Sequence, residues 1–88
     1  MAVAKIIKFG AEWCGPCRML DSVLADYTDV PVEVHNIDET PEEVVKKYGI
    51  RSVPTMIFVD ENNEVVEKKV GAMSLIQIKE VVTKHNGQ

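Results

Sequence analysis

The sequence of 88 residues has only two cysteines, and aromatic side chains make up only 6% of it. Two cysteines cannot form the several disulfides that hold a small secreted scaffold together. No apolar run approaches the roughly 18 residues that a membrane-spanning helix needs. Repeats, low-complexity tracts and linkers are also missing, so we expect residues 1–88 to form one domain.

Positive charge is also scarce, because 10 Lys and Arg residues face 14 Asp and Glu residues, for a formal net charge of -4. Nucleic acids and anionic membranes bind clustered basic side chains, so we expect neither as a partner. Residues 1–5 have no basic region ahead of a long apolar stretch, as a secretory signal would. We therefore expect a cytoplasmic monomer, in a compartment where a cysteine pair is more often catalytic or metal-binding than a permanent crosslink.

Short apolar segments separated by turn residues predict the element order βαβαββα. We expect strands at 3–9, 32–37, 55–59 and 64–70, a hairpin turn at 60–63, and helices from Cys17 to a break at 29–31, over 41–48, and from 74 to about 86. Ile6 and Ile7 stand side by side in the first strand, which indicates that both of its faces are buried. An α/β fold, with a four-stranded mixed sheet flanked by three helices, would cover all of the apolar faces.

Helix ends are marked by residues that satisfy free backbone groups. Thr40 and Glu43 have the spacing of a capping box, with Pro41 in the first turn, and Gly49 stands where a left-handed helix end is expected. The segment Ser74–Gln77 predicts a second capping box.

The two cysteines form the motif Cys14-Gly15-Pro16-Cys17, in the turn between the first strand and the first helix. Residues three apart on one helical turn are close enough for their sulfurs to form a disulfide. Free amides and the positive end of the helix favour a thiolate at Cys14, the outer cysteine. The motif therefore indicates a pair that alternates between dithiol and disulfide.

The cysteine pair has two other interpretations. A zinc site needs four ligands, but the histidines, His35 and His85, lie too far apart in the sequence to complete one with the cysteines. A purely structural disulfide would close so short a loop that it would stabilise the fold little. Both explain the pair less well than redox chemistry does.

The segment Ala11-Glu12-Trp13-Cys14-Gly15-Pro16-Cys17 resembles the active-site segment of thioredoxins, and its Gly-Pro dipeptide is unlike that of glutaredoxins or protein disulfide isomerases. Four further blocks are similar to thioredoxins in order and spacing: Asn36-Ile37-Asp38, Tyr48-Gly49-Ile50-Arg51, Val53-Pro54-Thr55 and Lys69-Val70-Gly71-Ala72. The resemblance covers nearly the whole chain and implies a thioredoxin-like fold.

The resemblance also implies an activity, that of a dithiol-disulfide oxidoreductase that reduces protein disulfides. Cys14 would attack the substrate and form a mixed disulfide, and Cys17, more buried, would resolve it. No metal or cofactor is expected. The implied partners are disulfide-containing proteins and a thioredoxin reductase or comparable electron donor. Two alternatives remain: a glutaredoxin-like protein reduced by glutathione, and a thioredoxin-fold binding module without redox turnover.

A substrate-binding surface follows from the same resemblance. Pro54 is expected to be a cis-proline facing the cysteines, and Gly71 to line the groove in which the substrate backbone lies. The other implied surface residues are Trp13, Gly15, Pro16 and Val53.

Asp38 matches a position close to the active-site tryptophan in thioredoxins. It is expected either to accept a hydrogen bond from the Trp13 indole or to be an ordinary loop carboxylate.

The chain departs from the thioredoxin pattern at its beginning, where the usual extra strand and helix are missing. The strand at 32–37 should then lie at a sheet edge, where Glu33 and His35 discourage association between edges. The size is that of a glutaredoxin while the motif is that of a thioredoxin, so the two features point to different electron donors.

A second departure lies behind the cysteines, where Lys8 replaces a buried Asp and Gly10 replaces an aromatic residue. Lys8 has three interpretations. It favours the Cys17 thiolate electrostatically, it acts as a base if burial lowers its pKa, or it extends its charged end to solvent.

Overall fold

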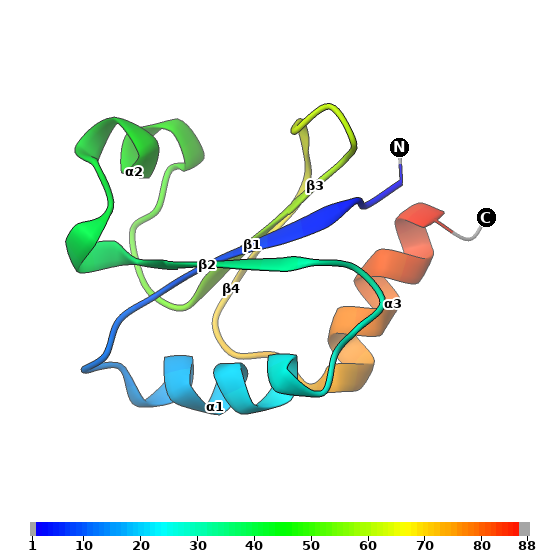
Figure 1. Ribbon diagram of the computed structural model, residues 1–88, viewed down its shortest axis with the longest axis horizontal. Coiled ribbons are helices and arrows are strands. Elements are labelled where there is room, and N and C mark those ends of the chain that lie inside the picture. Colours follow the sequence, from blue (N-terminus) through cyan, green and yellow to red (C-terminus); the bar gives the residue numbers. More distant parts are fainter. Residues whose placement is uncertain (1, 87–88) are drawn as a thin grey trace.

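The computed structural model describes residues 2–86, and its elements follow the predicted order (Figure 1). The strands are β1 (Lys5–Gly10), β2 (Val32–Asn36), β3 (Thr55–Val59) and β4 (Val65–Val70). The helices are α1 (Gly15–Ala25), α2 (Glu42–Tyr48) and α3 (Leu75–Asn86), with a short 3-10 helix, η1 (Ile37–Glu39), that the sequence did not predict. Within residues 2–86 no helix is long and apolar enough to cross a membrane.

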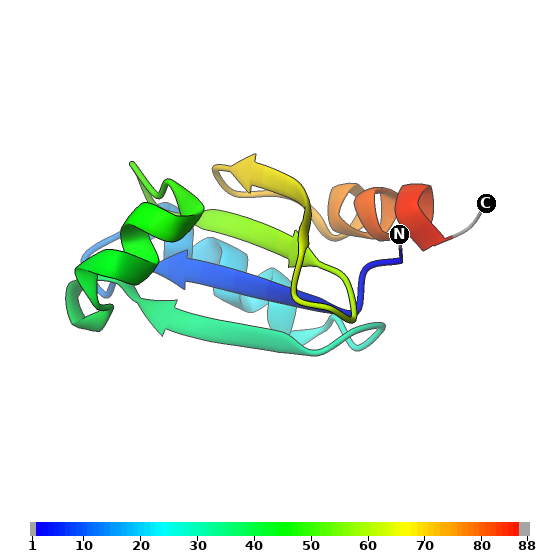
Figure 2. The same ribbon diagram turned by 90° about the horizontal axis from the view of Figure 1, so that it is seen from above.

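The four strands form one mixed sheet in the order β2-β1-β3-β4, as Figure 2 shows. β1 pairs with β2 in parallel, whereas the β1–β3 and β3–β4 pairs are antiparallel. The prediction that the second strand lies at a sheet edge is confirmed. Two polar contacts lie along this edge: Glu33 accepts a hydrogen bond from Lys5 Nζ at 3.1 Å and is 2.5 Å from His35 Nε2.

Helices cover both faces of the sheet, with α1 and α3 on one side and α2 on the other (Figure 1). Side chains alternate along β1, so Ile6 packs with α1 and α3 while Ile7 and Phe9 pack with α2. The prediction that the first strand is buried on both faces is therefore confirmed. By the same alternation Lys8 shares the face of Ile6 and meets α1.

The predicted start of the second helix is wrong. Pro41, rather than Thr40, is the N-cap of α2, and no side chain caps the helix. The Thr40 hydroxyl instead donates to the Asn36 carbonyl at 2.7 Å, because η1 turns the chain back just before α2 begins. The helix does end at Gly49 with a left-handed φ of 63°, as predicted.

The third helix begins as predicted. The Gln77 amide donates to Ser74 Oγ at 3.2 Å, and the Ser74 amide donates to Gln77 Oε1 at 2.9 Å, which completes the capping box.

The first helix ends earlier than predicted, at Ala25. Asp26 and Tyr27 donate their amides to Val23 and Leu24, so the last turn tightens and the helix stops, although Tyr27 stays in the core.

Candidate active site

The cysteine motif stands where β1 gives way to α1. After Gly10 the chain makes a turn in which the Cys14 amide donates to the Ala11 carbonyl at 3.3 Å. Cys14 is the N-cap of α1 with extended backbone angles, and Pro16 occupies the first helical turn, where its missing N–H is not needed. Cys14 and Cys17 form a disulfide, with their Cα atoms 5.2 Å apart.

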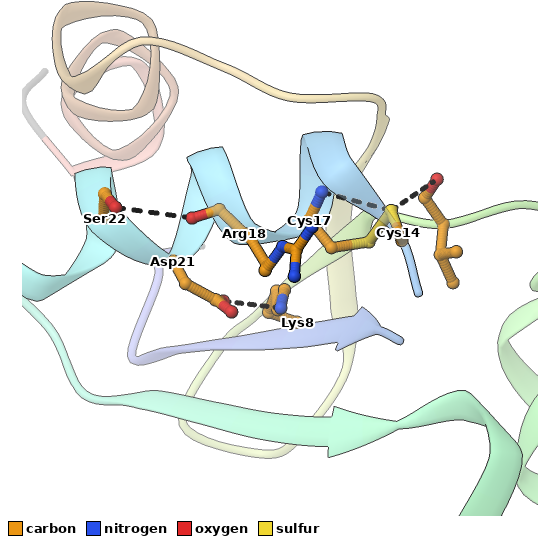
Figure 3. Close-up of polar contacts among 7 residues, drawn as sticks. Lys8, Cys14, Cys17, Arg18, Asp21 and Ser22 are labelled. Atoms are coloured by element: carbon orange, nitrogen blue, oxygen red, sulfur yellow. Dashed lines mark hydrogen bonds and ion pairs between the residues drawn. A yellow bond between two sulfur atoms is a disulfide. The ribbon is translucent and has the colours of Figure 1, made fainter. Parts of the chain in front are cut away.

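The sulfur of Cys14 receives a hydrogen bond from the helix backbone. The Cys17 amide donates to Cys14 Sγ at 3.1 Å (Figure 3). This amide is one of the free donors at the positive end of α1, so the contact strengthens when the sulfur becomes a thiolate. Cys14 is 6% exposed and Cys17 1% exposed, which leaves Cys14 as the more accessible of two largely buried residues.

The loop before β3 lies against the cysteines. The Val53 carbonyl oxygen is 3.7 Å from Cys14 Sγ, a distance that allows a thiol at Cys14 to donate to it once the disulfide is reduced. The peptide bond between Val53 and Pro54 is cis. The Pro54 carbonyl in turn accepts from the Gly71 amide at 2.8 Å, which joins this loop to the end of β4.

Gly71 has a φ of 97°, a conformation that side chains rarely adopt, and no heavy atom lies within 4 Å of the position that a Cβ would take there. Gly71 therefore allows the left-handed backbone conformation of this turn, and it leaves the surface next to its hydrogen-bond partner, Pro54, open.

Trp13 is exposed and is held in place by a carboxylate. Its indole Nε1 donates to Asp38 Oδ2 at 2.8 Å, and the Asp38 amide donates to Asn36 Oδ1 at 2.9 Å. The expectation that Asp38 accepts a hydrogen bond from the Trp13 indole is therefore confirmed. η1 is the element that brings Asp38 there, although the sequence did not predict it.

An open groove of about 400 Å³ lies beside the tryptophan. It is lined by Trp13, Ile37, Ile50, Arg51, Ser52 and Val53. These side chains are mainly apolar, with Arg51 as the single charge, so the groove suits an apolar side chain of a bound peptide. Gly15 and Pro16 are exposed at the start of α1.

Lys8 does not extend to solvent, so that interpretation is wrong. Its side chain is 3% exposed, and Nζ lies 2.5 Å from Asp21 Oδ1 on α1, a pair visible in Figure 3. Sequence reasoning missed Asp21, although its position four residues after Cys17 puts both on one face of the helix.

Comparisons with known proteins agree with this geometry. The family model for thioredoxin matches residues 2–84. A thioredoxin from Chlorobaculum thiosulfatiphilum is 36% identical, over 96% of this chain and 81% of the relative. Thioredoxin 1 from Synechococcus elongatus is 40% identical with the same coverage of both chains.

Solved structures are similar as well. A mutant thioredoxin from Halobacterium salinarum matches with a TM-score of 0.85 at 32% identity, over 99% of this chain and 78% of that one. A thioredoxin from Nicotiana alata matches with a TM-score of 0.77 at 31% identity, over 97% of this chain and 75% of that one.

Proposed function

Because this chain belongs to the thioredoxin family of dithiol-disulfide oxidoreductases, we propose that Cys14 is its nucleophile and Cys17 its resolving thiol in the reduction of protein disulfides. The observation that carries this assignment is the hydrogen bond from the Cys17 amide to Cys14 Sγ at the start of α1. A thiolate at Cys14 gains from both this donor and the helix dipole, and low-pKa thiolates are the attacking species in disulfide exchange.

The reaction runs in two exchanges. The Cys14 thiolate attacks one sulfur of the substrate disulfide, a Cys14–substrate disulfide forms, and the other substrate sulfur leaves as a thiolate that is protonated by water. Cys17 then loses its proton to solvent and attacks Cys14 Sγ. The Cys14–Cys17 disulfide forms, the second substrate sulfur leaves and is protonated, and two electrons have passed to the substrate.

The substrate would dock on the exposed surface around Cys14. Trp13, fixed by Asp38, and Val53 border the apolar groove. The Val53 carbonyl lies beside the Cys14 sulfur, and the next residue, Pro54, is hydrogen-bonded to Gly71. Gly15 and Pro16 are exposed next to Cys14 in the chain, and no heavy atom lies within 4 Å of a Cβ placed on Gly15, so the surface at Gly15 is open.

The family implies disulfide-containing proteins as substrates and a disulfide reductase as the source of electrons. We propose a thioredoxin reductase as that donor, acting on residues 1–88 as one monomeric domain. Reduction of proteins requires a reducing compartment, and the cytoplasm is our proposal because thiols there are kept reduced.

The test is to trap the intermediate. In Cys17→Ser, the mixed disulfide on Cys14 cannot be resolved, so incubation with an oxidised protein such as insulin should give a covalent adduct that dithiothreitol releases. Cys14→Ser is the matched control and should give no adduct. An adduct on Cys17 in Cys14→Ser, together with no adduct on Cys14 in Cys17→Ser, would reverse the assignment.

The two alternatives are tested by different measurements. Turnover with glutathione and its reductase, but not with thioredoxin reductase, would favour the glutaredoxin-like alternative. Unchanged function in a variant with both cysteines replaced by serine would favour the non-redox binding module.

A further inference from the structure

A buried cation lies behind the cysteine pair without a part in the exchange steps above. Lys8 is 2% exposed as a residue, whereas its partner Asp21 has a side chain that is 51% exposed. Lysine is almost never buried to this extent unless it is paired, and here the pair is formed with a group that water still reaches. The positive charge is therefore the less screened of the two.

The Lys8 ammonium lies beside Cys17, and Gly10 makes the space for it. A Cβ built on Gly10 would be 2.5 Å from Lys8 Nζ and 3.4 Å from Cys17 Cβ. These two distances limit the separation between Nζ and Cys17 Cβ to about 6 Å. Any side chain at position 10 would push the ammonium away from the cysteine.

From this arrangement we propose that Lys8 is a positioning residue for the second exchange: its buried charge stabilises the Cys17 thiolate and so speeds resolution of the mixed disulfide. The inference rests on the proposed roles of Cys14 and Cys17. In this proposal Lys8 acts only through its charge and forms no bond, and the proton lost by Cys17 goes to solvent.

Other charged groups face the same space. Glu12, Arg18, Asp21 and His35 line, with Lys8, an open groove of about 420 Å³ between α1 and the edge strand β2. Asp21 opposes the effect of Lys8 because it is negative and lies one helical turn from Cys17, while Arg18 reinforces it from an exposed position. If Asp21 cancels about half of the effect of the Lys8 charge, the remaining charge at a distance of about 6 Å raises the population of the Cys17 thiolate by about tenfold.

The experiment follows the two exchanges separately. Reduced protein is mixed rapidly with a symmetrical aromatic disulfide that releases one coloured thiolate when Cys14 attacks and a second when Cys17 resolves. In Lys8→Met, the second phase should be about tenfold slower at acidic pH, and the midpoint of its pH profile should rise by about one unit, with the first phase nearly unchanged. Lys5→Met is the matched control, because Lys5 lies on the same strand but pairs with Glu33 at the sheet edge.

Two further variants separate charge from packing. Gly10→Ala keeps the lysine but displaces its charge, so its second phase should also be slow, and adding Lys8→Met to it should slow that phase little more. Replacing Asp21 by Asn in the Lys8→Met background should recover part of the lost rate, because the opposing negative charge is then gone.

A second phase in Lys8→Met that matches the wild type overturns the proposal. So does a second phase that is slowed equally at every pH, because that is the mark of a packing defect. If instead Cys14→Ser keeps the first phase and Cys17→Ser loses it, the assignment of the two cysteines has failed, and this is seen before any Lys8 variant is made.

Discussion

Replacing Glu67 by Gln should lower the free energy of unfolding by about 1–2 kcal/mol at neutral pH and by almost nothing in strong acid. Glu67 lies on β4, and its carboxylate joins this strand to α3. It is 2.7 Å from His85 Nε2 and 3.0 Å from Lys84 Nζ, while Lys69 Nζ is 3.2 Å away on its own strand. The hydrogen bonds from His85 and then Lys84 lower the pKa of Glu67 from 4.5 to about 2.

The magnitude follows from linkage between ionisation and folding. A depression of the pKa from 4.5 to about 2 corresponds to about 3 kcal/mol if it is taken in full. Lys84 is 61% exposed and Lys69 41% exposed, so water and salt screen much of this interaction and about 1–2 kcal/mol remains. Because the pKa is lower in the folded state, the contribution is complete above pH 4.5 and is lost as the pH falls toward about 2.

The assay is urea unfolding of the wild type and Glu67→Gln at a series of pH values, with Glu61→Gln as control. Glu61 lies exposed in the hairpin and forms no ion pair within residues 2–86. The difference between wild type and Glu67→Gln should shrink as the solution is acidified, while the control stays close to the wild type throughout. A difference that is constant across pH would refute the reasoning, since ionisation of Glu67 would then not be its source.

Two further substitutions test the fold itself by urea unfolding. Tyr27→Phe should raise the free energy of unfolding by about 1 kcal/mol, because the Tyr27 hydroxyl is buried without a hydrogen-bond partner among residues 2–86; a loss of stability would show that the hydroxyl is satisfied. Gly49→Ala should lower it by about 1 kcal/mol, because Gly49 ends α2 at a φ of 63°; an unchanged midpoint would mean that the left-handed turn is not needed there.

Much of the fold could be predicted because it depends on regular patterns in the sequence. The adjacent Ile6 and Ile7 identify both faces of β1 as buried, and the helical period of Leu20 and Leu24 identifies the face of α1 that joins the core. Single residues that mark a helix end also gave correct predictions: Gly49 ends α2 in a left-handed conformation, and Ser74 accepts a backbone hydrogen bond at the start of α3.

Local signals failed where two partners compete for the same group. Thr40 has the right type and spacing to cap α2, but the Asn36 carbonyl lies within reach of its hydroxyl once η1 has formed. η1 depends on the Asn36 side chain accepting the Asp38 amide, an interaction that a helical or strand period does not reveal. The same turn brings Asp38 to Trp13, so that part of the site was expected only from the family resemblance.

The unit formed by Lys8, Gly10 and Asp21 was the hardest part to predict, since its members come from two elements and only their contacts give them a shared role. Burying an ammonium costs free energy that a partly exposed carboxylate offsets only in part, and a methionine in the same place would not carry that cost. We therefore expect the Lys8–Asp21 ion pair to stabilise the folded state no more than a methionine at position 8 would. The advantage that we propose for it lies in the chemistry of the neighbouring thiol, so Lys8→Met should slow the second exchange without weakening the fold.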